Sequence, residues 1–162
     1  MASRWNLTND KATPREVVTL RYASLPPPLG IVAVHFWFTV ADRRVGRFDR
    51  WEVWQTADAG GVSFGHLHCN LQSPEGHVGG GSTVLAATWR GDDARRLSEV
   101  LMLAKDEYPY RDHYRAWPGP NSNTFVAWVL DQARTAFQLP WKAHGRRYAR
   151  SPAQPPPLFK AR

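Results

Sequence analysis

The alternation of hydrophobic and polar residues predicts strands in the first half of the chain. Segments 16–22 and 48–55 alternate and are rich in β-branched and aromatic residues, as half-buried strands are. The most apolar run, 31–40, is short and β-branched, which predicts a central strand buried on both faces. Segments 63–71 and 83–89 read as two more strands, because glycine-rich turns or loops precede each of them.

The second half has the three- and four-residue spacing of helices with one buried face. A first helix is predicted from a cap at Asp92 or Asp93, and 108–110 ends it. A second helix follows the proline- and glycine-containing turn 117–120, and we expect the segment 139–141 to stop it. Its first turn holds three residues with capping side chains, and its apolar positions continue to residue 137; the capping residues are Asn121, Ser122 and Asn123.

Strands followed by helices predict an α+β fold, in which an antiparallel β-sheet packs against two or three helices. The length of 162 residues suits one domain, for which we expect the bounds 15–148. The polar segment 1–14 is expected to be disordered. The basic, proline-rich segment 149–162 is expected to be a disordered tail.

The net charge of +7 is concentrated at the carboxyl end. Residues 1–141 contain 15 basic and 14 acidic residues, whereas residues 142–162 contain the remaining 6 basic residues and no acidic residue. A tail of this kind attracts phosphates or anionic lipid without specificity. We therefore expect no specific nucleic-acid partner.

Cysteine usage and hydropathy bear on the compartment. The single cysteine, Cys69, rules out an intrachain disulfide and is compatible with a reducing environment. No apolar run approaches the ~20 residues of a membrane span, and the amino-terminal segment lacks the apolar run of a signal peptide. A cytoplasmic protein without a membrane span is expected, with its oligomeric state left open.

The residues that suggest chemistry are His35 and Ser122. His35 is the one ionisable residue of the apolar run 31–40, and Ser122 lies in the first turn of a helix. A serine acts as a nucleophile when an imidazole takes its proton and a third group holds that imidazole. Glu52, on the neighbouring strand, is the proposed third group, with Asp42, His66 and His68 as competitors. The alternative is structural: Ser122 caps its helix, and His35 is a core histidine bonded to backbone or water.

No cofactor or metal is expected. His66 and His68 face the same way on a strand, and His35, His77 or Cys69 are conceivable partners for a metal. However, no third ligand has a fixed spacing, and no acidic cluster accompanies the pair. The glycine run 79–82 lacks the ending of a phosphate-binding loop and is interpreted as a linker.

Several segments resemble a bacterial family that is labelled a domain of unknown function. The resemblance spans about residues 17–148 and is most specific in the run Trp117-Pro118-Gly119-Pro120-Asn121-Ser122-Asn123-Thr124-Phe125. The other segments that carry it are 33–37, 50–53, 108–110, 139–140 and 145–148. The label itself implies no activity.

A more distant resemblance does imply one. Histidine on an early strand, followed much later by Asn-Cys-Asn-x-Phe at the start of a helix, is the arrangement of circularly permuted papain-like proteins. These include lecithin:retinol acyltransferase-like enzymes and desumoylating isopeptidases. Asn121-Ser122-Asn123-Thr124-Phe125 is similar to that segment, with Ser122 where the thiol would be, and His35 matches the histidine. The resemblance implies a permuted papain-like fold and a hydrolase or acyltransferase that acts on an amide, ester or thioester.

The serine is a departure from that pattern. A thiol at a helix N-terminus beside an imidazole ionises readily, whereas a hydroxyl needs its base at the moment of attack and an oxyanion hole as well. We expect helix N–H groups near Asn123 to supply that hole. The open alternative is a catalytically inactive module that binds a peptide, glycan, lipid or other small molecule in the same cleft. In either case the residues expected to contact the ligand are Trp37, Trp117, Asn121, Asn123 and Tyr110.

Overall fold

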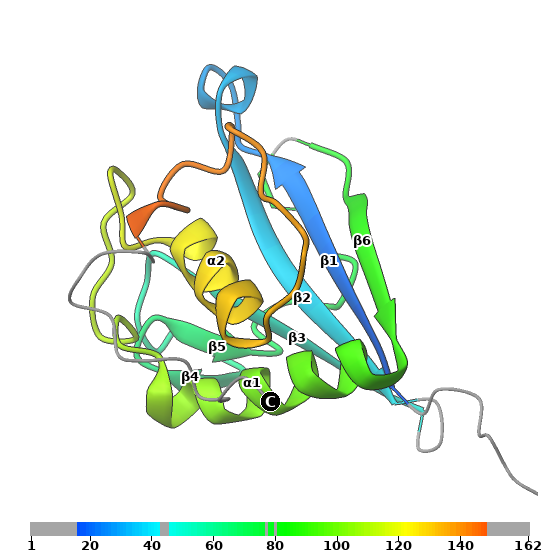
Figure 1. The fold of residues 1–162 in the computed structure, drawn as a ribbon. Helices are drawn as coiled ribbons and strands as arrows, with labels where there is room; N and C mark the ends of the chain where they lie inside the picture. Colours follow the sequence, from blue (N-terminus) through cyan, green and yellow to red (C-terminus); the bar gives the residue numbers. More distant parts are fainter. Residues whose placement is uncertain (1–15, 43–45, 77, 80, 149–162) are drawn as a thin grey trace, which may run out of the picture.

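A computed structural model describes residues 16–42, 46–76, 78–79 and 81–148 of the chain. The expectations for 1–14, for the tail 149–162, and for His77 and Gly80 lie outside the described residues. Figure 1 shows a twisted antiparallel sheet with two helices packed against it, so the predicted α+β class is confirmed. The strand order is β4-β5-β3-β2-β1-β6.

Six strands and two α-helices make up the described part of the fold. The strands are β1 (Glu16–Ser24), β2 (Val34–Asp42), β3 (Arg47–Val53), β4 (Val62–Phe64), β5 (Leu67–Cys69) and β6 (Val84–Arg90). The α-helices are α1 (Gly91–Glu107) and α2 (Ser122–Gln132), and a 3₁₀ turn, η1 (Leu29–Ile31), precedes β2.

Two predicted strands differ from the structure. The strand predicted from residue 31 begins at Val34 instead, because Leu29–Ile31 form the 3₁₀ turn η1. The strand predicted over 63–71 is a hairpin of two short strands, β4 and β5. Its turn contains Gly65 with φ +67°, a left-handed conformation that suits glycine and breaks an extended run.

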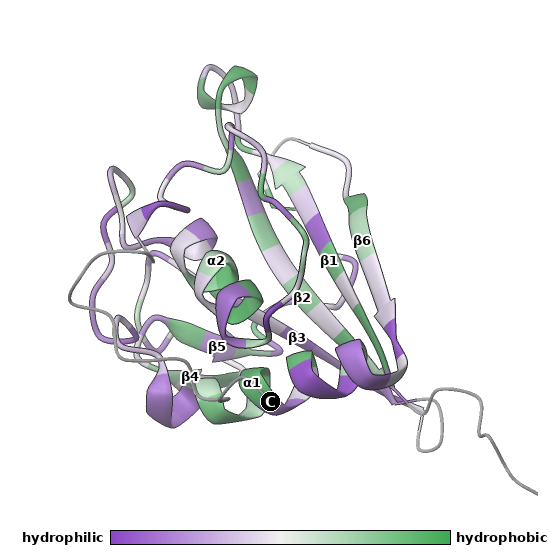
Figure 2. Cartoon of the chain, in the orientation of Figure 1, coloured by the Kyte–Doolittle hydropathy of each residue, from purple (hydrophilic) through white to green (hydrophobic). Residues whose placement is uncertain are grey.

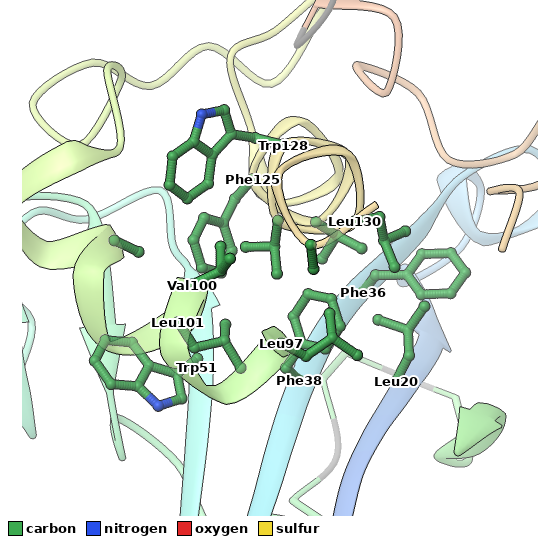
Figure 3. Close-up of a cluster of buried hydrophobic side chains, with 14 of the residues drawn as sticks. Leu20, Phe36, Phe38, Trp51, Leu97, Val100, Leu101, Phe125, Trp128 and Leu130 are labelled. Atoms are coloured by element: carbon green, nitrogen blue, oxygen red, sulfur yellow. The ribbon is translucent and has the colours of Figure 1, made fainter. Parts of the chain in front are cut away.

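Strand β2 is buried on both faces, as predicted. Its even-numbered residues, including Phe36 and Phe38, point into the main core, where α1 and α2 pack on them (Figure 3). Its odd-numbered residues point to the opposite face, where Trp37 packs with Ala23 and Val78 in a second, smaller cluster. His35, an odd-numbered residue, is therefore buried on the face opposite the helices, and β2 becomes the scaffold of the candidate site.

The ends of the helices are set by backbone geometry that the apolar pattern does not reveal. Helix α1 begins after Arg90, which makes no side-chain cap, so the predicted cap at Asp92 or Asp93 is wrong and both acids lie in the first turn. Helix α2 ends at Gln132 rather than continuing to 137, because Arg134 adopts φ +54°. The chain then turns so that Phe137 packs edge-on against Trp89 of β6.

The sheet opens between β2 and β3 at the end where α2 begins. Pairing of these strands stops at Phe38 opposite Trp51, and from Val34 to Trp37 strand β2 pairs with β1 only. Figure 1 shows β2 and β3 diverging towards this end, and α2 contacts both strands. The amino end of α2 therefore reaches the edge of β2 beside His35.

Candidate active site

The candidate site is built around a hydrogen bond between two buried side chains. His35 Nε2 lies 3.0 Å from Glu52 Oε2. His35 is 5% exposed, and Glu52 has no exposed surface. Both residues lie on the sheet face opposite the helices, because they belong to the alternate positions of β2 and β3 that point away from the main core.

Arg50 completes this buried cluster. Its Nη2 donates to Glu52 Oε2 at 2.7 Å, and its Nη1 donates to the carbonyl oxygens of Ser73 and Gly76. The guanidinium also lies 4.2 Å from the centre of the Trp37 ring, a cation–π distance. Although Arg50 has no exposed surface, its charge is thus held by a carboxylate, two carbonyls and an aromatic face.

These contacts set the protonation states in the cluster. Burial alone would raise the pKa of Glu52, but the hydrogen bonds and charges of His35 and Arg50 outweigh it, so the pKa of Glu52 lies below its usual value. An ionised carboxylate only accepts hydrogen bonds, so His35 Nε2 carries the proton that points to it. In the neutral form of the ring this places the proton on Nε2 and leaves Nδ1 without one, and Nδ1 forms no hydrogen bond with the residues described. It is chemically able to act as a base.

Ser122 is the first residue of α2, and it does not cap the helix. Asn121 is the cap: its Oδ1 accepts from the N–H groups of Asn123 and Thr124, and the Thr124 hydroxyl accepts from the Asn121 N–H. The Ser122 hydroxyl makes no hydrogen bond to the described part of the chain, although the residue is only 6% exposed. Capping therefore does not explain why a hydroxyl occurs here.

The same cap alters the expected oxyanion hole. The N–H groups of Asn123 and Thr124 are already used by Asn121 Oδ1 at 3.0 and 3.2 Å. Within the described ranges, the N–H of Ser122 itself has no acceptor, so it is the first-turn donor left for a developing negative charge.

A side-chain tether joins the two halves of the candidate site. Asn123 Nδ2 donates to the carbonyl oxygens of Val34 and His144, each at 2.9 Å. Asn123 follows Ser122, and Val34 precedes His35, so the tether fixes the start of α2 against the start of β2. Among the described residues, no hydrogen bond joins Ser122 to His35 directly.

The residues expected to contact a ligand fall into two groups. Trp117 is 74% exposed and lines a surface cavity of about 570 Å³, and Tyr110 packs against Tyr148 on the rim of that cavity. Trp37 has no exposed surface and supports Arg50. Asn121 and Asn123 use their side chains for the cap and the tether.

The sequence reasoning missed Arg50 and the carboxyl-terminal wall of the cavity. Arg50 shares a strand face with Glu52 at a two-residue spacing, and this was a readable signal for an ion pair. The cavity wall consists of Trp141, His144, Gly145, Arg146, Arg147 and Tyr148 beside Pro118. The family resemblance includes Gly145-Arg146-Arg147-Tyr148 but implies no role for these residues.

The described part of the chain contains no group of three or more histidine, cysteine or acidic side chains placed to hold a metal. His66 Nδ1 bonds the Trp54 carbonyl, and His68 bonds Ser63 and the Thr56 carbonyl, so both rings already have partners. The same residues include no helix that is long and apolar enough to cross a membrane.

Fold and site together define an α+β domain with a buried histidine–glutamate–arginine cluster beside a helix N-terminus. Residues 15–148 match the family model described as "Protein of unknown function (DUF3750)", so the chain belongs to this family, as the sequence had suggested. No curated protein and no solved structure matches the chain. None of the comparisons returns a papain-like protein, and that more distant relationship stays a prediction.

Proposed function

We propose that this protein is a hydrolase or acyltransferase acting on an amide, ester or thioester, with Ser122 as nucleophile and His35 as base. The observation that carries the proposal is the hydrogen bond from His35 Nε2 to the ionised Glu52, because it leaves Nδ1 of the same ring able to accept a proton. Glu52 holds the tautomer, and Arg50 holds Glu52.

The chemistry follows the usual course of serine acyl transfer. The Ser122 hydroxyl oxygen attacks the acyl carbon while its proton passes to His35 Nδ1, and the N–H of Ser122 faces the developing oxyanion. The proton then passes to the leaving amine, alcohol or thiol as its bond to carbon breaks. Water or another acceptor attacks the acyl-serine and gives its proton to His35 Nδ1. That proton returns to the Ser122 oxygen as its bond to the acyl carbon breaks and the acyl product leaves.

The tether supports the approach that this step requires. Because Asn123 holds the Val34 carbonyl, the backbones on either side of Ser122 and His35 are fixed close to each other. Glu52 holds the His35 ring, so the adjustment falls to the Ser122 hydroxyl, and catalytic hydrogen bonds are often long until a substrate is bound. The side chain of Ser122 has no competing hydrogen bond in the described residues that would hold it elsewhere.

Labelling with a fluorophosphonate probe tests the nucleophile. We expect intact-mass measurement to show one adduct on the wild-type chain, and peptide mapping to place it on Ser122. Ser122→Ala should abolish labelling. Ser98→Ala, which removes another buried serine from α1, should retain it. An unlabelled wild-type chain, or equal labelling of Ser122→Ala, would show the proposal to be wrong.

A second candidate function is a binding module without turnover. It is favoured by the cavity of about 570 Å³, where the exposed rings of Trp117 and Trp141 accompany Arg146 and Arg147. Such a surface suits a peptide, glycan or lipid that presents both an apolar face and an acidic group. Under this alternative, Trp117→Ala weakens ligand binding measured by calorimetry, Ser122→Ala binds like wild type, and the fluorophosphonate labels neither.

A further inference from the structure

The turn η1, which projects beyond the sheet in Figure 1, carries apolar side chains. Around η1, Leu29 is 58% exposed, Ile31 is 74% exposed and Val32 is 44% exposed. They belong to the turn that rises above the ends of β1 and β2, where Figure 2 shows hydrophobic colouring. All three side chains are exposed and lie outside the buried core. Three large exposed aliphatic residues in four positions are unusual for a loop in contact with water alone.

A second segment places an exposed tryptophan beside this turn. His144 Nε2 lies 2.9 Å from the Val32 carbonyl, and the N–H of Val34 donates to the Lys142 carbonyl. Trp141, which is 60% exposed, packs its ring edge-on against His144. We refer to Leu29, Ile31, Val32 and Trp141 as the apolar tip.

The segment that brings Trp141 to the tip is strongly basic. Lys142, Arg146 and Arg147 follow it, and the chain contains no acidic residue after Asp131. None of these three cations forms an ion pair with the described residues. Lys142 instead lies 5.7 Å from the Trp141 ring centre, and Arg146 donates to the carbonyl oxygens of its own segment. Positive charge therefore lies beside Trp141, at one side of the apolar tip.

We propose that the apolar tip docks this protein on an anionic lipid surface. Aliphatic side chains and tryptophan enter the boundary between headgroups and acyl chains, while nearby lysine and arginine attract the anionic headgroups. Tryptophan suits that boundary because its ring is apolar and its N–H is polar. The η1 part of the apolar tip projects from the sheet, and the whole tip contains four residues, whereas a stable protein partner covers about 800 Å² on each side. A bilayer needs no matching concave surface, and so the shape and the charge both favour lipid.

Vesicle flotation of the full chain tests this docking. We expect binding to vesicles of equal parts phosphatidylcholine and phosphatidylglycerol, weak binding to phosphatidylcholine alone, and release by salt. Ile31→Asp should lower the partition coefficient about tenfold, because the inserted apolar surface is lost and a like charge meets the headgroups. Trp141→Ala should lower it as well. Met102→Asp is the matched control: Met102 is 64% exposed on α1, away from the tip, and its variant should bind like wild type.

Charge-reversal variants distinguish the contribution of the basic residues after Trp141 to vesicle binding from that of basic residues elsewhere. Arg146→Glu with Arg147→Glu should weaken binding to the anionic vesicles, whereas Arg90→Glu, an exposed arginine at the end of β6, should have little effect. Equal binding by wild type and Ile31→Asp would overturn the proposal, as would failure of wild type to float. Concentration-dependent dimerisation that Ile31→Asp abolishes would identify a second copy as the occupant and overturn it too. Ser122→Ala should float normally, so this result is independent of the proposed chemistry.

Discussion

The buried charge cluster offers a sharp test of how the site is held together. Glu52→Gln removes one negative charge and keeps a carbonyl that can still accept from His35 Nε2. Arg50 then keeps its positive charge and has no exposed surface, but the carboxylate that lies 2.7 Å from it in the wild type is gone. The substitution thus separates the effect of charge from that of hydrogen-bond geometry.

The expected loss in the free energy of unfolding is large for a change at one side-chain atom. Removing one partner of a buried ion pair costs about 3–5 kcal/mol, because the other charge is left desolvated. A domain of this kind has a total stability of roughly 5–15 kcal/mol, so the variant is expected to fold but to unfold much more readily. Combining Glu52→Gln with Arg50→Met removes the orphaned charge and should recover part of the loss.

Urea denaturation followed by tryptophan fluorescence measures these free energies of unfolding. The matched control is Glu75→Gln, which breaks the exposed pair with Arg21 and should cost about 0–1 kcal/mol. If Glu52→Gln lost less than about 1 kcal/mol, or if the double variant lost the sum of the two single losses, the cluster would not be a coupled buried ion pair.

The same cluster predicts that the protein loses stability at acid pH. The pKa of Glu52 in the folded protein lies below its value in the unfolded chain, so the carboxylate contributes stability that is complete above the unfolded value of ~4.3. That contribution disappears as the pH falls through the folded pKa. Wild type should therefore lose more stability on acidification than Glu52→Gln, which has no such group. Parallel pH profiles of the two proteins would contradict this assignment.

Three further expectations concern the scaffold. Chemical denaturation should show that Asn121→Ala lowers the free energy of unfolding by about 0.5–2 kcal/mol, because Asn121 caps α2. Ser122→Ala should change it by less than about 0.5 kcal/mol, because Ser122 does not cap the helix. Gly145→Ala should cost about 1–3 kcal/mol by the same measurement, because Gly145 has φ +90° and a Cβ there would lie 2.4 Å from Asn121 Oδ1. The Cys69 thiol, whose pKa burial raises to about 11, should resist iodoacetamide at neutral pH until the chain unfolds; rapid alkylation of the folded protein would contradict its burial.

The fold was predictable where one periodicity dominates a segment. The alternation in 48–55 and the apolar run 31–40 led to β3 and β2 with shifted ends, because a half-buried strand alternates and a strand covered on both faces is apolar throughout. The errors occur where single residues take left-handed backbone angles. Gly65 divides one predicted strand into a hairpin, and Arg134 ends α2 while the apolar spacing still continues to Phe137. That spacing reflects packing of Phe137 on Trp89, a contact between distant segments that a local pattern does not encode.

The candidate site was partly readable for a similar reason. An ionisable residue in an apolar strand needs a partner, so His35 directed attention to the neighbouring strand and to Glu52. Arg50 was missed because a charged residue on an alternating strand is ordinarily solvent-exposed; here the segment around Ser73 and Gly76 covers it. The cavity wall at Trp141 and Arg147 was missed because it lies in a stretch without regular structure.

The central claim is that Ser122 and His35 act on each other. Ser122→Cys tests it directly, since a thiol reports a nearby base through its own pKa, while buried Cys69 remains silent near neutral pH. We predict that the pH profile of iodoacetamide alkylation gives the introduced thiol an apparent pKa well below the ordinary ~8.5, and that adding His35→Gln moves this pKa upward. The same alkylation profile with and without His35 would contradict the account.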